Sequence, residues 1–287
     1  MTQRSHNQPV AVVTGATGML GSATAAALAS RGASTVLVVR DQDSGRRLID
    51  SLPTHDEVRH RLVVGDLSEP GSVRDVAEQI RAGVEDVAVL IHAAAALFRE
   101  RRVNSAGHEA MFATNVLARF LLTHELKAPL EAGPAGRVIN VTGPTPDRLD
   151  FDDLMAEQAF NAFRQFRATN AANLQLAFEL ARRARETSVT SNAYTPGALQ
   201  SDLMAEMPPL VRVITLPFGR SAAKAAEALS DLAVADHYAT TTGEFYKRER
   251  PSRPPKASLD AASQRRLWGR CAQLLGVDPA TGFGAGP

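Results

Sequence analysis

Cysteine, lysine, tyrosine and tryptophan are scarce in this chain of 287 residues, and each scarcity narrows its chemistry. The single cysteine, Cys271, cannot form an internal disulfide, so we expect a reducing, cytoplasmic environment. The net charge of +1 leaves no excess of basic residues to bind nucleic acid or an anionic membrane. The polar start of the chain has no apolar core of a signal peptide, and no stretch reaches the roughly 18 apolar residues of a membrane helix.

Short apolar runs rich in β-branched residues alternate along the chain with longer alanine-rich helical patterns. The expected strands are 10–14, 35–39, 61–65, 87–91, 137–141 and 188–194. The expected helices are about 19–30, 42–51, 70–82, 105–130, 152–185 and 220–235. This alternation predicts an α/β fold, a Rossmann-like doubly wound parallel sheet, in one domain over 1–287.

Two stretches interrupt the alternation. Residues 196–219 are rich in proline and methionine, and 247–258, which read "KRERPSRPPKAS", are basic and proline-rich. We expect the second stretch to be an exposed loop.

The segment "VVTGATGMLG" joins the first expected strand to the first expected helix and carries Gly15, Gly18 and Gly21 at intervals of three. This spacing allows a tight turn, a close approach of backbone to a pyrophosphate, and packing of the helix on the sheet. The helix N-terminus would supply amide donors for the phosphates. The pattern therefore predicts a dinucleotide site, and a tight turn without a ligand is the alternative.

The end of the second strand distinguishes the two nicotinamide cofactors. An acidic residue there bonds the ribose 2′-hydroxyl of NAD, whereas arginine suits the 2′-phosphate of NADP. The sequence "VLVVRDQD" has Arg40 first and Asp41 next, which favours NADP(H). After the third strand, Asp66 is placed either to meet the adenine edge or to cap the next turn.

These segments, with "LIHAAA", "MFATNVLARFLLTHEL", "RVINVTG" and "NAYTPG", resemble the short-chain dehydrogenase/reductase family in order and spacing, in particular its retinol-dehydrogenase-like branch. The resemblance covers nearly everything from Pro9 to about Gly276. It implies a nicotinamide-dependent oxidoreductase. The cofactor contacts that it adds to those above are Thr17, Met19, Leu20, Leu67, Ala93, Ala94, Asn115, Val141, Asn170, Pro196, Gly197, Leu199 and Ser201.

The family's catalytic tetrad of Asn, Ser, Tyr and Lys is mostly missing. Asn115 matches the Asn, but Gly143 stands at the Ser position, Phe166 at the Tyr and Asn170 at the Lys. Phenylalanine cannot donate a proton, and asparagine has no charge to lower the pKa of a neighbour. We therefore expect only Asn115 and Thr142, the hydroxyl nearest the lost Ser, to serve as catalytic residues.

The resemblance also implies a helical substrate lid over about 198–219. Expected substrate contacts are Phe166, Met204, Met207 and Phe218, and no metal site is expected. The sequence is similar to the atypical ketoreductases of angucyclinone polyketides, of the type found in simocyclinone biosynthesis. That similarity implies NADPH-dependent reduction of an aromatic ketone whose own neighbouring phenol supplies the proton. A dinucleotide sensor without redox activity and a cofactor-templated cyclase are the alternatives.

Overall fold

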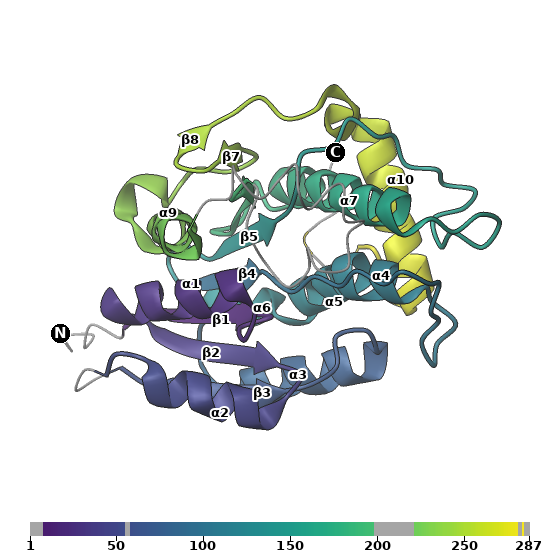
Figure 1. Ribbon diagram of the computed structural model, residues 1–287. Helices are drawn as coiled ribbons and strands as arrows, with labels where there is room; N and C mark the ends of the chain where they lie inside the picture. The colour runs from purple at the N-terminus through teal and green to yellow at the C-terminus, as the bar shows by residue number, and fades with distance from the viewer. Residues whose placement is uncertain (1–7, 55–57, 198–220, 281–282, 284–287) are drawn as a thin grey trace.

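The computed structural model describes residues 8–54, 58–197, 221–280 and 283, which form a single α/β domain around one sheet (Figure 1). The order of its strands is β3-β2-β1-β4-β5-β6-β7-β8. Every pair is parallel except β7 with β8, so the predicted doubly wound parallel sheet is confirmed. The strands are β1 (Val10–Thr14), β2 (Ser34–Val39), β3 (His60–Val64), β4 (Val89–His92), β5 (Arg137–Val141), β6 (Thr190–Thr195), β7 (Phe245–Lys247) and β8 (Arg250–Pro251).

The central strands are apolar without alternation because helices cover both faces of the sheet. In β2, Val36 and Val38 belong to the hydrophobic core on one face, while Leu37 and Val39 belong to the core on the other. All four are at most 2% exposed. This two-sided burial explains the continuous apolar run, as expected for parallel strands.

Different sets of helices cover the two faces. One core includes residues of α1 (Met19–Ser30), α2 (Gln42–Ser51) and α9 (Ala222–Val234). The opposite core includes residues of α3, α5, α7 and α10. The elements of that face are α3 (Pro70–Gly83), α4 (Ala110–Phe112), the π-helix Ala113–Leu117, α5 (Ala118–Glu125), α6 (Lys127–Ala132), α7 (Ala162–Arg183) and α10 (Ala261–Leu275).

The long helix expected over 152–185 starts ten residues later than its pattern and ends two residues earlier, at Arg183. It begins at Ala162, where the Asn161 side chain accepts a hydrogen bond from the amide of Arg164. Upstream, the Asp153 carboxylate accepts from the amides of Glu157 and Gln158 and holds this segment in turns. These side-chain acceptors compete with the hydrogen bonds of a helix. The segment before Ala162 is therefore not helical, although its sequence pattern favours a helix.

Two further expectations needed correction. The helix expected over 105–130 starts only at Ala110, passes through the π-helical turn, and breaks between α5 and α6. The exposed loop expected over 247–258 contains the end of β7, the edge strand β8 and a 3₁₀ turn over Lys256–Leu259. Neither β7 nor β8 was expected as a strand.

The C-terminal helix α10, also not expected, packs along α7 and α5. The ring of Trp268 meets that of Phe120 edge-on, with 4.7 Å between centroids. The segment expected to form the lid, 198–219, lies outside the described residues. Among the helices that the structure describes, none is long and apolar enough to cross a membrane.

Candidate active site

A cleft of about 850 Å³ opens at the carboxyl edge of the sheet, where the strand order reverses between β1 and β4. This is the edge at which doubly wound sheets bind their ligands. The expected site residues that line it are Gly15, Thr17, Gly18, Met19, Leu20, Arg40, Asp66, Leu67, Ala93, Ala94, Asn115, Val141, Thr142, Gly143, Phe166, Asn170, Pro196 and Gly197. Those that lie outside the described residues are Leu199, Ser201, Met204, Met207 and Phe218.

The glycine turn after β1 leaves the backbone bare toward the cleft. Gly15 has a φ of +64°, and a Cβ there would lie 2.6 Å from the Cα of Ala94. A Cβ on Gly21 would lie 2.2 Å from the carbonyl oxygen of Gly15. Gly18 precedes α1 and no side chain caps the helix, so the amides of its first turn are open to a ligand. The turn therefore fits the pyrophosphate of a dinucleotide.

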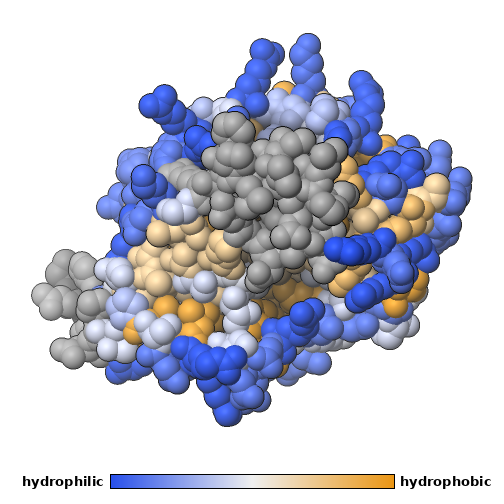
Figure 2. Space-filling model, viewed as in Figure 1, coloured by the Kyte–Doolittle hydropathy of each residue, from blue (hydrophilic) through white to orange (hydrophobic). Residues whose placement is uncertain are grey.

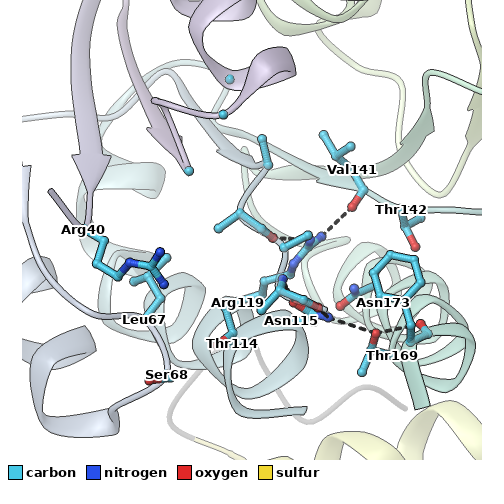
Figure 3. Close-up of a pocket in the computed structure, with 18 of the residues that line it drawn as sticks. Arg40, Leu67, Ser68, Thr114, Asn115, Arg119, Val141, Thr142, Thr169 and Asn173 are labelled. Atoms are coloured by element: carbon cyan, nitrogen blue, oxygen red, sulfur yellow. Dashed lines mark hydrogen bonds between the residues drawn. The ribbon is translucent and has the colours of Figure 1, made fainter. Parts of the chain in front are cut away.

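Arg40 and Asp41 take different tasks at the end of β2. The Asp41 carboxylate caps α2 by accepting from the Ser44 amide at 2.9 Å. Hydrogen bonding to the Ser44 side chain, and then to this amide, lowers the pKa of Asp41. Arg40 instead lines the cleft, on the side of Leu67 and Ser68 (Figure 3). Arg40 is thus available to a ligand at the position that reads the ribose, while Asp41 is committed to the helix.

Asp66 occupies the next loop and is held by its own turn. One carboxylate oxygen accepts from both the amide and the hydroxyl of Ser68, each at 2.8 Å. The structure therefore shows the turn-capping role among the two that the sequence left open. The side chain is exposed and still lines the cleft, so the adenine contact stays a prediction.

Asn115 joins the loop after β4 to helix α7. Its amide accepts from the backbone N–H of Ala96 at 2.7 Å and donates to the carbonyl of Ala96 at 2.9 Å. It also donates to the Thr169 hydroxyl at 3.2 Å. The π-helical turn around Asn115 directs this buried side chain out of the regular helix, a distortion that is frequent at functional sites.

Asn170 takes up the space between α7 and the end of β5. Its side-chain oxygen accepts from the amide of Gly143 at 3.1 Å and from the hydroxyl of Thr142 at 3.2 Å. The Thr142 hydroxyl also lies 3.1 Å from the Asn170 carbonyl, so its single proton is already shared between two acceptors. A Cβ on Gly143 would come within 3.3 Å of the Asn170 amide nitrogen. Thr142 is therefore poorly placed to donate to a substrate carbonyl, although its catalytic role stays a prediction.

A comparison with known proteins identifies the family of this chain. The sequence profile described as short chain dehydrogenase matches residues 9–209. The chain belongs to the short-chain dehydrogenase family. It is thus a member of an oxidoreductase family whose fold binds a nicotinamide dinucleotide, and the resemblance read from the sequence is confirmed at that level.

Relatives align along nearly the whole chain. A Streptomyces protein named "Putative daunorubicin C-13 ketoreductase DnrU" is 32% identical over 273 residues, covering 92% of this chain and 92% of that protein. Human retinol dehydrogenase 12 is 29% identical over 274 residues, covering 93% of this chain and 86% of that protein. The crystal structure of an uncharacterised protein from Mycobacterium paratuberculosis has a TM-score of 0.78 at 25% identity and covers 96% of each chain.

No tyrosine of this short-chain dehydrogenase reaches the described cleft. The Tyr194 side chain is fully buried, and its hydroxyl donates to the Ala225 carbonyl at 2.8 Å on the far side of the sheet. Tyr238 and Tyr246 pack edge-on against each other, 5.5 Å between centroids, and neither lines the cleft. A displaced tyrosine therefore does not replace the one lost at position 166.

No histidine lies in the described lining of the cleft to supply the acid either. His92, at the end of β4, is 1% exposed and lies 2.8 Å from the Thr123 hydroxyl, away from the cleft lining. Burial and the nearby Arg119 cation hold the pKa of His92 well below its usual value, so the ring is neutral. The carboxyls in the described lining, Asp66 and Glu69, both lie in the segment that follows β3. The described substrate end of the cleft thus holds no acid.

An apolar wall closes this end of the cleft. Phe98, Phe160 and Phe166 pack around the buried side chains of Leu97 and Met111. Figure 2 shows hydrophobic residues on the left and on the right of the face seen in Figure 1, bordered by hydrophilic residues. Phe166 was predicted from the sequence, whereas five further residues that line the cleft were not: Phe98, Arg102, Arg119, Thr169 and Asn173. Phe98 and Arg102 lie in the irregular segment after β4 and the other three in helices, and none of these segments carries a motif that separates lining residues from core.

Replacing Arg40 with alanine is expected to weaken NADPH binding by about tenfold to hundredfold and to leave NADH binding little changed. The reason is that only NADPH carries the 2′-phosphate, and a charge-assisted bond to it is worth roughly 1.5–3 kcal/mol. Fluorescence titration of each cofactor measures the effect. The matched control is Arg46→Ala, an exposed arginine on α2 outside the cleft. An equal loss for both cofactors in R40A would contradict the assignment.

Proposed function

We propose that this chain is an NADPH-dependent ketoreductase acting on aromatic ketones of the polyketide type that carry a hydroxyl next to the carbonyl. The observation that carries the proposal is the described cleft itself. Its lining includes the glycine turn, Arg40 and the Pro196–Gly197 turn, whereas its other described end has an apolar wall and no acid. Such a site can position a flat aromatic ketone but needs a proton from elsewhere.

The cofactor would be held along the carboxyl edge of the sheet. The glycine turn would take its pyrophosphate, Arg40 its 2′-phosphate, and the backbone at Pro196 and Gly197 its carboxamide. Bound NADPH supplies a hydride. Asn115 fixes the loop after β4, and Phe166, which lines the cleft, would help to exclude water from the bound substrate.

The substrate would supply the proton. A phenol has a pKa of about 10, the same as the tyrosine that is missing. A hydroxyl ortho or peri to a ketone is already at proton-transfer distance, so it can protonate the oxygen as the carbonyl is reduced. The phenolate left behind is delocalised and regains its proton from water. This balance of proton and hydride requires no side-chain acid.

The relatives support the type of reaction and leave the substrate undefined. One bears the name of a ketoreductase and another that of a retinol dehydrogenase, and both names refer to a carbonyl–alcohol conversion. The angucyclinone assignment, the cytoplasmic location and the absence of nucleic-acid and membrane partners stay predictions from the sequence.

The test is to follow NADPH absorbance with a peri-hydroxy aromatic ketone and to identify the product. We expect one alcohol formed for each NADPH oxidised. Product formed without NADPH oxidation would favour the cyclase instead. NADPH binding without turnover, across a panel of such ketones, would favour the sensor, which the three substituted tetrad positions also suit.

A further inference from the structure

Arg119 places a guanidinium under the floor of the cleft. It is the second residue of α5, one helical turn after Asn115, and is 5% exposed. One terminal nitrogen donates to the carbonyl of Val141 at 2.7 Å and the other to the carbonyl of Ala94 at 2.8 Å (Figure 3). The side chain thereby ties the end of β5 to the loop after β4, where both line the cleft.

The charge of this guanidinium is not neutralised within the described residues. Burial alone shifts the pKa of Arg119, with no contribution from a carboxylate of the described residues, and its Nε is buried without a partner. The neighbouring His92 is neutral, as argued above. Burial lowers the pKa of Arg119 to about 9, which still leaves it protonated at neutral pH. The two carbonyl dipoles solvate the cation but carry no net charge, so the floor of the cleft is positive.

The position of this charge matters because of what the cleft would hold. In a doubly wound sheet the dinucleotide lies across the carboxyl edge, and the Pro196–Gly197 turn after β6 would hold its nicotinamide end on the side of β4 to β6. The family lysine that would normally add a cation there is Asn170. Arg119 is therefore the buried cation of this half of the described cleft.

We infer that Arg119 makes the cleft bind the reduced, uncharged nicotinamide in preference to the oxidised, cationic one. The inference rests on the proposed function. A fixed positive charge repels the oxidised ring and is indifferent to the reduced ring, so the preference follows from Coulomb's law in a site of low dielectric. It favours loading of NADPH and release of NADP⁺, the direction that a reductase needs.

The test measures dissociation constants for NADPH, NADP⁺ and 2′-phosphoadenosine 5′-diphosphoribose, which lacks the ring. The proteins are the wild type, Arg119→Gln and Arg119→Lys. We expect R119Q to shift the NADP⁺/NADPH affinity ratio about tenfold toward NADP⁺, equivalent to about 1.4 kcal/mol. R119K keeps the charge and should keep the wild-type ratio, and the ligand without a ring should bind all three proteins alike.

A further measurement on the wild type does not depend on how the variants fold. The tetrahydro analogue of NADPH has an uncharged ring that cannot give a hydride, and we expect it to bind as tightly as NADPH. If the analogue binds only as weakly as NADP⁺, the site does not discriminate by the charge of the nicotinamide ring, and the inference is wrong. An unchanged ratio in folded R119Q, or equal weakening of all three ligands, overturns it as well. Failure of the wild type to bind any of the nucleotides would instead overturn the proposed function.

Discussion

Methylating the hydroxyl next to the ketone should slow reduction by about 10²–10⁴-fold, the usual contribution of a positioned general acid. The described cleft leaves the substrate as its own proton donor, because Tyr194, Tyr238 and Tyr246 are all directed elsewhere and His92 is sealed away. A methyl ether removes that proton and keeps the ring system. The measurement is kcat and KM for the hydroxy and methoxy ketones, with the methoxy compound's binding measured separately to exclude a steric effect.

The variant Phe166→Tyr tests the source of the proton while the substrate stays the same. Because Phe166 lines the cleft, the new phenol would stand at the family's acid position. It should recover part of the rate with the methoxy ketone and change the rate with the hydroxy ketone little.

Two carboxylic acids that could replace the substrate as proton donor, Asp202 and Glu206, lie in the sequence of 198–220. If the methoxy ketone is reduced as fast as the hydroxy ketone by the wild type, substrate assistance is wrong, and loss of that rate in D202N or E206Q would identify the acid.

The layered fold could be predicted because strong local signals agree with its tertiary contacts. β1, β5, α1 and α2 begin and end at the residues expected, since a buried β-rich run or a glycine turn defines each boundary. β4, at Val89–His92, begins two residues later and ends one residue later than expected, because the amide of the apolar Val87 bonds to the Pro129 carbonyl and not to a neighbouring strand. Boundaries set by partners rather than by residue type are thus the ones that the sequence misplaces.

The cofactor half of the site could be predicted from the sequence, whereas the buried charge of Arg119 could not. The two glycines Gly15 and Gly18 lie in a strand–turn–helix unit, and Arg40 follows the end of a strand. At both places the local geometry of the chain limits the roles that a residue can have. Arg119 lies within "MFATNVLARFLLTHEL", a segment in which it reads as an ordinary helical cation. Its burial results from carbonyls that are 22 and 25 residues away in the sequence and that only the sheet brings beside it.

Gly15→Ala should abolish measurable NADPH binding, a loss of at least about a hundredfold, and lower the free energy of unfolding by roughly 2–4 kcal/mol. The left-handed backbone at φ +64° costs an L-residue about 1–2 kcal/mol. In addition, the new Cβ would lie 2.6 Å from the Cα and 2.9 Å from the amide nitrogen of Ala94. These contacts are backbone, so no side chain can rotate away, and either the glycine turn or the loop after β4 must move. Both line the cleft, which is why cofactor affinity falls together with stability.

Two other glycines make this prediction specific. Gly32 has a φ of +81° but lies outside the cleft, and its Cβ would approach only the Gln8 side chain, at 3.4 Å. Gly32→Ala should therefore lose about 1–2 kcal/mol of stability and keep its NADPH affinity. Gly71, in α3, would place a Cβ in open space, so Gly71→Ala should be neutral or slightly stabilising. Urea unfolding and cofactor titration of the three variants measure this order. If Gly15→Ala and Gly32→Ala bound NADPH equally tightly, the glycine turn would not be the binding site of the pyrophosphate. Gly15→Ala would then affect only the stability of the fold.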